Sequence, residues 1–248
     1  GWGEQPIMPS LGFTTGAAES YSVSISSQGA TTPSQTARRM AAKAITCVDF
    51  GESLQHEADL TSFDADGFTL NWTTNISAAR LINYIAIGGS DVTNAKVITW
   101  ETPTATGSKA VTGVGFQPSL VLHSGDYFNG AATHISAWAR FFFGAMDSSG
   151  NQGVNAFTAE DAVNPTNTDR MQLVDACVGM TSGSGAQVQK ASFTSMDTDG
   201  FTLNFSAIEN AFTRNVMSLA LKVSSMGRAK VGSFAKDTGA APDSQAIT

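Results

Sequence analysis

Large apolar residues alternate with polar ones in many short stretches along the chain. Residues 201–205 read F-T-L-N-F, and residues 68–72 read F-T-L-N-W. A period of two predicts a β-strand with one buried face, because successive side chains of a strand point to opposite sides. Stretches rich in Gly, Asn and Ser lie between these segments, as is typical of antiparallel turns. The pattern therefore predicts an all-β chain.

The same pattern predicts where individual strands and turns lie. Further strands are expected at 119–123, 139–146, 172–178, 216–223 and 230–234, with a hairpin turn at 148–153. Asp66-Gly67 and Asp199-Gly200 each lie between two apolar stretches, and Asp-Gly supplies the positive φ angles of a tight hairpin turn. Only residues 35–45, which are rich in alanine, favour a short helix.

A long internal repeat runs through the chain. T-S-F-D-A-D-G-F-T-L-N-W at 61–72 recurs as T-S-M-D-T-D-G-F-T-L-N-F at 194–205, and A-K-V at 95–97 recurs at 229–231. A match of this length, with smaller matches before and after it in the same order, indicates two copies of one structural unit.

The boundary between the units is predicted after Thr112. A-V-T at 110–112 runs into G-V-G-F-Q-P, while the chain closes on A-I-T and opens with G-W-G-E-Q-P. The units are then 1–112 and 113–248, and the second carries a longer insertion around 126–168. We expect two tandem antiparallel β-sandwich domains of a jelly-roll or lectin-like type. The register also makes a donated or exchanged terminal strand a specific hypothesis.

Charge is scarce. Only 14% of the residues are charged, against about 25% in an ordinary soluble domain, and the net charge is −7. Such a chain lacks the clustered Lys and Arg that bind nucleic acid. The longest apolar runs, at 81–87 and 135–146, fall short of the ~20 residues that a membrane span needs, so a soluble protein is expected.

Four aspartates in the Asp-Gly hairpins are weak candidate metal ligands: Asp64, Asp66, Asp197 and Asp199. Calcium prefers carboxylate oxygens, but the spacing of an EF-hand and its closing Glu are missing. We interpret the aspartates as turn residues, with calcium as the alternative. The three histidines have no zinc-site spacing, so no cofactor is expected.

Three residues are candidate ligand-binding residues. Arg80 and Arg214 lie at equivalent positions of the repeat, each before a predicted strand. One interpretation is an internal salt bridge or a contact with a loop carbonyl, and the other is a planar donor for a sugar or a carboxylate. Trp138 is the third candidate, because an indole ring can stack on a sugar.

The repeat also predicts core residues. Trp72 and Trp100 align with phenylalanines of the second unit and are expected in the core. Cys47 and Cys177 occupy equivalent positions, so each should lie in its own unit, too far from the other for a disulfide. We interpret both as buried hydrophobic residues.

No arrangement of catalytic residues is recognisable. No serine lies in a G-x-S-x-G nucleophile elbow. The carboxylate pair Glu160-Asp161 lies in the longer loop of the second unit, where a solvated loop is the expected role and a glycosidase dyad the alternative. We expect a protein that is not an enzyme.

Three motifs carry a resemblance. They are T-G-V-G-F-Q-P-S-L-V-L at 112–122, D-x-D-G-F-T-L-N, and N-Y-I-A-I-G at 83–88. Together they resemble a β-sandwich repeat of phage and prophage structural proteins, and their order is similar to the H-type lectin domain of some phage tail fibres. The first unit departs from the pattern at Glu4, where the second has Phe116. The resemblance implies a virion-surface or extracellular protein and carries over no binding residue.

Two functions from different classes follow. The first is a non-enzymatic structural protein of the virion surface, such as a capsid decoration protein or a tail or fibre component, with other virion or surface subunits as partners. The alternative is a lectin-like module that binds host cell-surface glycan. A surface of hydroxyls and amides suits both, and exposed strand edges favour a homo-oligomer.

Overall fold

The computed structural model describes residues 8–28, 33–77, 79–126, 138–165, 167–209, 212–225 and 229–235. Within these ranges the chain forms sixteen β-strands and no helix, which confirms the all-β prediction. A helix that is long and apolar enough to cross a membrane is accordingly not found in the described part of the chain.

The strands form four antiparallel sheets. The inner three-stranded sheet has the order β1 (Ser10–Gly16), β2 (Glu19–Gln28), β3 (Gln35–Ala41). The outer three-stranded sheet has the order β4 (Ile45–Val48), β5 (Leu54–Phe63), β6 (Phe68–Asn75). The six-stranded sheet has the order β12 (Thr168–Leu173), β11 (Gln152–Glu160), β10 (Trp138–Asp147), β9 (Leu120–Gly125), β16 (Asn215–Val223), β7 (Val92–Glu101). The four-stranded sheet has the order β13 (Val178–Thr181), β14 (Gln187–Asp197), β15 (Gly200–Ile208), β8 (Gly107–Thr112).

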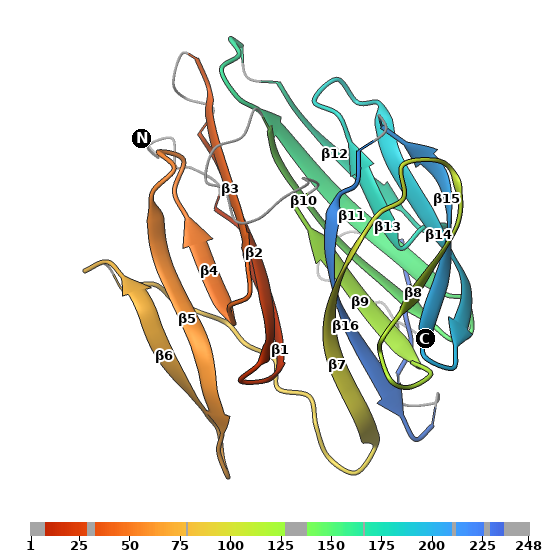
Figure 1. The fold of residues 1–248 in the computed structure, drawn as a ribbon. Helices are drawn as coiled ribbons and strands as arrows, with labels where there is room; N and C mark the ends of the chain where they lie inside the picture. The colour runs from red at the N-terminus through yellow and green to blue at the C-terminus, as the bar shows by residue number, and fades with distance from the viewer. Residues whose placement is uncertain are drawn as a thin grey trace, which may run out of the picture.

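The sheets are stacked as four layers, in the order outer three-stranded, inner three-stranded, six-stranded and four-stranded (Figure 1). The main hydrophobic core lies between the last two layers. It joins Phe142 and Val216 of the six-stranded sheet to Phe201 and Leu203 of the four-stranded sheet, all fully buried. These two sheets together form a β-sandwich.

Strand β2 has two different faces because its residues alternate. Val23 and Ile25 face the six-stranded sheet, where they join clusters with Met217 and Ala139. On the other face the buried hydroxyl of Ser24 accepts the backbone N–H of Val48 in β4 at 3.2 Å. The inner sheet is therefore attached to the six-stranded sheet by apolar packing, whereas polar contacts join it to the outer sheet, among them the ion pair of Arg39 with Glu57.

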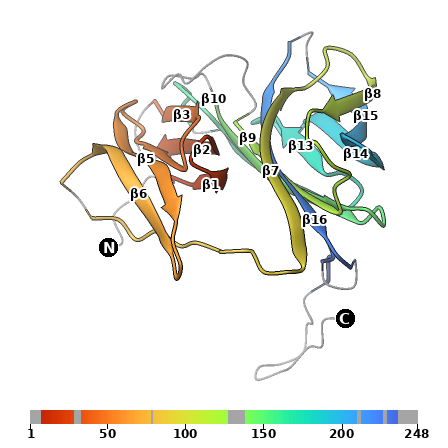
Figure 2. The same ribbon diagram turned by 60° about the horizontal axis from the view of Figure 1, so that its bottom comes forward.

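Strands β7 and β8 come from residues 92–112 but belong to the sheets of the second half. Val97 of β7 pairs with Leu219 of β16, and Val111 of β8 pairs with Phe201 of β15. The chain between β6 and β7 crosses from the outer layer to the six-stranded sheet (Figure 2). The division into two units at Thr112 stays a prediction, as does the insertion around 126–168, which contains β10, β11 and residues outside the described ranges.

Three predicted elements differ from the structure. Residues 35–41 form a strand instead of a helix, because pairing with β2 outweighs the helix propensity of alanine. The strand predicted at 172–178 is divided, since β12 ends at Leu173 and β13 begins at Val178. Residues 230–234 form no strand.

Both Asp-Gly hairpins are confirmed. Phe63 pairs with Phe68 around the first, and Asp197 pairs with Gly200 around the second. Gly200 has a φ of 146°, whereas Gly67 is not among the positive-φ glycines. The first turn therefore forms without the conformation that Asp-Gly was expected to supply.

Candidate functional site

The two Asp-Gly hairpins share one hydrogen-bond pattern. The hydroxyls of Ser62 and Thr69 each donate to one carboxylate oxygen of Asp64, both at 2.7 Å. In the second hairpin Asp197 accepts the hydroxyls of the corresponding serine and threonine at 2.7 and 2.6 Å. The hydroxyl bonds hold the pKa of Asp64 below its usual value. The two oxygens of each carboxylate are thus engaged within the turn itself.

Asp199 fixes the loop that follows β8. Its carboxylate accepts the backbone N–H of Gly115 at 2.6 Å and that of Gly113 at 3.0 Å, and these bonds lower the pKa of Asp199. Asp66 is the equivalent residue in the first half and is exposed. Within the described residues, no group of three or more His, Cys, Asp or Glu side chains is placed to hold a metal ion.

The two recurring arginines lie on different segments of the fold, and no contact between them is described. Arg214 precedes β16, and its guanidinium donates to the carbonyl of Thr213 at 3.1 Å and lies 5.6 Å from the ring centre of Phe212. Its backbone N–H donates to Thr102 Oγ1 at 3.0 Å. Arg80 is exposed on the segment between β6 and β7. Of the two interpretations of the arginines, Arg214 thus shows the contact with a loop carbonyl.

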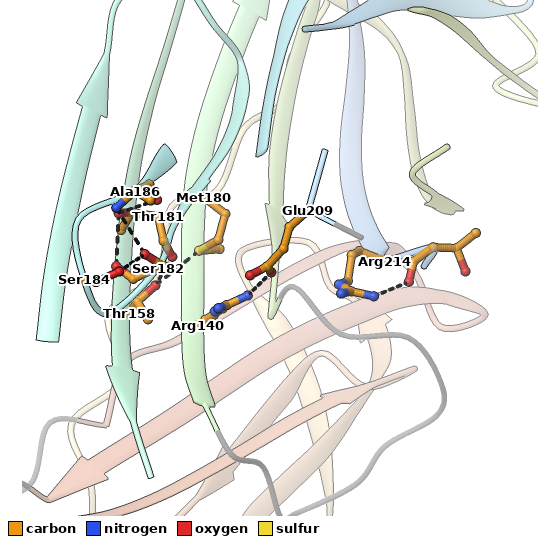
Figure 3. A network of polar contacts seen from close by, with 10 residues as sticks. Arg140, Thr158, Met180, Thr181, Ser182, Ser184, Ala186, Glu209 and Arg214 are labelled. Carbon is orange, nitrogen blue, oxygen red and sulfur yellow. Dashed lines mark hydrogen bonds and ion pairs between the residues drawn. The ribbon is translucent and has the colours of Figure 1, made fainter. Parts of the chain in front are cut away.

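The sequence analysis missed the ion pairs of Arg38 and Arg140. Arg38 in β3 donates to Asp126 at 2.8 Å with both side chains almost fully buried, which joins the inner sheet to the segment after β9. Burial lowers the pKa of Arg38, and the charge of Asp126 opposes that shift. Arg140 in β10 donates to Glu209, which follows β15, at 2.7 Å (Figure 3). The sequence contained one indication of this pair, because Arg140 is a charged residue within the apolar run at 135–146 and would need a partner if that run were buried.

Trp138 lies at the start of β10 among polar groups. The guanidinium of Arg140 lies 4.5 Å from the centre of the indole ring. Across the sheet Trp138 pairs with Glu160, whose carboxylate accepts the side-chain amide of Asn167 at 2.8 Å. A Cβ placed on Gly183 would lie 3.2 Å from the indole and 3.0 Å from the Asn167 side chain. We call Trp138, Glu160, Asn167 and residues 182–184 the Trp138 cluster.

Hydroxyl groups fix the loop of this cluster to the sheet. Thr158 in β11 donates to the carbonyl of Thr181 at 2.6 Å, and Thr181 donates to Asp169 at 2.5 Å. The hydroxyls of Ser182 and Ser184 are 3.0 Å apart (Figure 3). The cluster therefore presents one half-buried aromatic ring beside a carboxylate, an amide and hydroxyls, and these are groups that bind sugars.

Glu160 ends a strand, Asp161 directly follows it, and both carboxylates are bonded to other parts of the fold, so the expectation of a solvated loop is wrong. Glu160 ends β11 and accepts the amide of Asn167. Asp161 accepts the backbone N–H of Thr36 in β3 at 2.6 Å and thereby joins the six-stranded sheet to the inner sheet. Both carboxylates have structural partners.

Three buried residues on neighbouring strands of the six-stranded sheet, Trp100, Ser218 and His123, contact one another through polar atoms. Ser218 Oγ accepts the indole N–H of Trp100 at 2.8 Å and lies 2.8 Å from Nδ1 of His123. Complete burial lowers the pKa of His123 to about 3. His56 in β5 contacts Asn75 at 3.1 Å, and His134 lies outside the described residues. The histidines therefore form core and strand contacts where they are described.

The predicted core residues are confirmed in part. Trp100 is in the main core, but Trp72 is exposed on β6, because no strand of the described chain covers it. Both cysteines are free. Cys177 is buried, and burial raises the pKa of its thiol to about 12, whereas Cys47 is half-buried.

Comparison with known protein families, curated proteins and solved structures finds no match to this chain. Function is therefore inferred from the residues and their geometry.

Proposed function

We propose that the chain is a non-enzymatic structural protein of a virion surface, a capsid decoration protein or a tail or fibre component. One observation carries the proposal: residues 92–112 of the first repeat supply a strand to each sheet of the second repeat's sandwich. Main-chain hydrogen bonds along a whole strand hold neighbouring repeats together without a specialised site. Such a design suits a protein whose work is stable attachment to its neighbours.

Two sequence features support a particle surface as the location. The motifs at 112–122 and 83–88 resemble those of phage β-sandwich repeats, and only 14% of the residues are charged. Part of that charge is used internally, as in the buried pair of Arg38 and Asp126. A surface with few charged groups packs against other subunits at a lower desolvation cost than a highly charged one.

Immunogold labelling tests this proposal. An antibody raised against the purified chain is applied to virions produced from the genome that encodes it, and virions from a genome lacking this gene are the control. Gold particles on the capsid or the tail are the expected result. Absence of label, with the chain found only in the fraction free of particles, contradicts the proposal.

The alternative is a lectin-like module that binds host cell-surface glycan, and the Trp138 cluster supports it. An indole beside the amide of Asn167 and the carboxylate of Glu160 offers one stacking surface and several hydrogen-bonding groups. A glycan array tests this function. Binding that is lost in Trp138→Ala and kept in Trp72→Ala, which removes an exposed tryptophan elsewhere, favours the lectin. Hydrolysis of a polysaccharide, lost on changing Glu160 or Asp161, contradicts both functions.

A further inference from the structure

The first half of the chain exposes apolar residues whose equivalents in the second half are buried. Phe68 of β6 is 36% exposed, whereas its equivalent in β15, Phe201, is 0% exposed. Ile87 is 54% exposed, whereas its equivalent in β16, Leu221, is 4% exposed. The exposed set is Phe68, Trp72, Leu81, Ile82, Tyr84, Ile85 and Ile87, which we call the open face.

In the second half, Trp100 of β7 lies against the rings of Phe201 and Phe205, the equivalents of Phe68 and Trp72, whereas Leu219, the equivalent of Ile85, packs with residues of the inner sheet. Strand β8 pairs along β15, and strand β7 pairs along β16. In the outer sheet β6 is an edge strand, so the position that β8 occupies beside β15 has no strand in the described chain. The open face around Phe68 and Trp72 is thus the surface that a segment like 92–112 would cover.

A second segment like 92–112 exists in this chain. A-K-V at 229–231 repeats 95–97, and A-I-T at 246–248 repeats A-V-T at 110–112. Phe234 is 65% exposed, whereas its equivalent Trp100, in the main core, is 9% exposed. Residues 229–235 form no strand, and the N–H of Val231 donates to Asp147 at 2.9 Å. Residues 229–235 therefore do not pair with another strand, although the equivalent residues of β7 pair with β16.

We propose that residues 229–248 of one copy cover the open face of a second copy, as 92–112 cover the second half within one chain. The proposal rests on the structural function proposed above. In the pairing of β8 with β15, Val111 lies opposite Phe201 and Ala110 lies opposite Thr202. The repeat places Ile247 opposite Phe68 and Ala246 opposite Thr69. Residues 229–231 then pair with 85–87, as 95–97 pair with 219–221.

The contact is heterologous, because the donated segment and the open face are different surfaces of the chain. Each copy offers one donor and one acceptor, so association continues from copy to copy in an open filament or closes into a ring. The exposed rings of Phe68 and Trp72 provide the driving force for association, because their equivalents Phe201 and Phe205 are the rings that Trp100 contacts.

A pair of glycines gives a sharp test. A Cβ on Gly200 would lie 2.0 Å from the carbonyl oxygen of Val111 in β8, whereas a Cβ on Gly67 meets nothing within 4 Å. In the proposed assembly Gly67 lies opposite Thr248 and beside the carbonyl oxygen of Ile247, as Gly200 lies opposite Thr112 and beside the carbonyl oxygen of Val111. Gly67→Ala should therefore leave the monomer intact and weaken self-association by about tenfold or more. Sedimentation velocity over a concentration series measures this. A monomeric wild-type chain, or a variant that associates like the wild type, overturns the proposal.

Cysteine crosslinking tests the register and the source of the segment. The double variant Thr69→Cys, Ala246→Cys should give a ladder of covalent oligomers on a non-reducing gel. The matched control, Thr202→Cys with Ala110→Cys, should crosslink within one chain, because these residues already lie opposite each other. A crosslinked monomer from the first variant means that the same chain supplies its own segment, and an unlinked monomer means that the register is wrong. Both results overturn the proposal.

These results are separable from the virion function. Immunogold label on virions together with a monomeric chain in solution overturns the strand donation and leaves the structural function standing. A ladder of oligomers without label on virions supports the strand donation and overturns the virion function.

Discussion

The indole N–H of Trp100 donates to the hydroxyl of Ser218 at 2.8 Å, although the two residues are 118 positions apart. Trp100 lies in β7, from the first repeat, and Ser218 lies in β16, from the second. Their hydrogen bond joins two neighbouring strands of the six-stranded sheet that are far apart in sequence, and His123 joins it from β9.

Replacement of Ser218 by alanine should destabilise the protein. It removes the partner of the Trp100 indole and of His123 Nδ1, both in the core, and a buried polar group without a partner costs about 1–3 kcal/mol. Urea denaturation measures the change in the free energy of unfolding. Ser148→Ala, at an exposed turn, is the control and should change it by less than about 0.5 kcal/mol. Equal effects of the two variants would mean that the buried network contributes nothing.

His123 should make stability depend on pH in mildly acid solution. Its pKa is about 3 in the folded protein against an ordinary 6.5, so between these values the unfolded chain binds a proton that the folded chain does not. The free energy of unfolding therefore decreases as pH falls below 6.5, by about 2 kcal/mol between pH 7 and pH 5 from this group.

The variant His123→Gln isolates that contribution. Its free energy of unfolding, obtained from urea titrations at pH 7 and pH 5, should change by about 2 kcal/mol less than that of the wild type. An unchanged pH dependence in the variant would show that His123 is not the responsible group.

The two hairpin glycines should respond differently to alanine. Gly200 has a φ of 146° and no room for a Cβ beside Val111, so Gly200→Ala should cost more than about 2 kcal/mol and loosen β8 from β15. Gly67→Ala should be within about 0.5 kcal/mol of the wild type in dilute solution. Thermal unfolding of the monomers decides the matter, and a large loss of stability in Gly67→Ala would contradict the described open edge.

The buried ion pair should matter more than an exposed one. Asp126→Asn leaves the Arg38 charge buried without its counter-ion, which costs about 3–5 kcal/mol. Asp59→Asn breaks the more exposed pair with Lys43 and should cost less than about 1 kcal/mol. Urea midpoints of both variants provide the comparison. Equal midpoints would mean that the contact between the inner sheet and the segment after β9 is unimportant for stability.

Alternation of side chains predicted most of the strands, because one-sided burial in a sheet repeats every two residues. It failed at 35–41, where β3 is covered on both faces and the alanines suggested a helix. It failed again at 230–234, whose pattern matches β7 but which has no neighbouring strand in the described chain. The alternation of side chains shows that a segment is suited to a β-strand, but it does not show whether a neighbouring strand is present to pair with it.

The candidate site was only partly predictable. Trp138 was identified by its residue type, but its neighbours Asn167 and Gly183 are brought to it by the arrangement of β10, β11 and the loop before β14. The pair of Arg38 and Asp126 depends on contact between two sheets that are far apart in sequence. Repeat alignment predicted Trp72 to be buried, which is wrong because its equivalent is covered by strands that β6 lacks.

The pairing of β7 with β16 has a kinetic consequence. The six-stranded sheet is complete only when residues more than a hundred positions apart have met, since Trp100 and Ser218 are separated by 118 positions. Closing so long a loop requires chain entropy to be lost before the contacts are gained, and a high contact order slows folding. During synthesis β7 leaves the ribosome long before β16, so its backbone groups have no β16 to pair with until that strand has been made. The pairing of β7 with β16 is therefore expected to slow folding and to leave time for wrong strand pairing in a newly made chain.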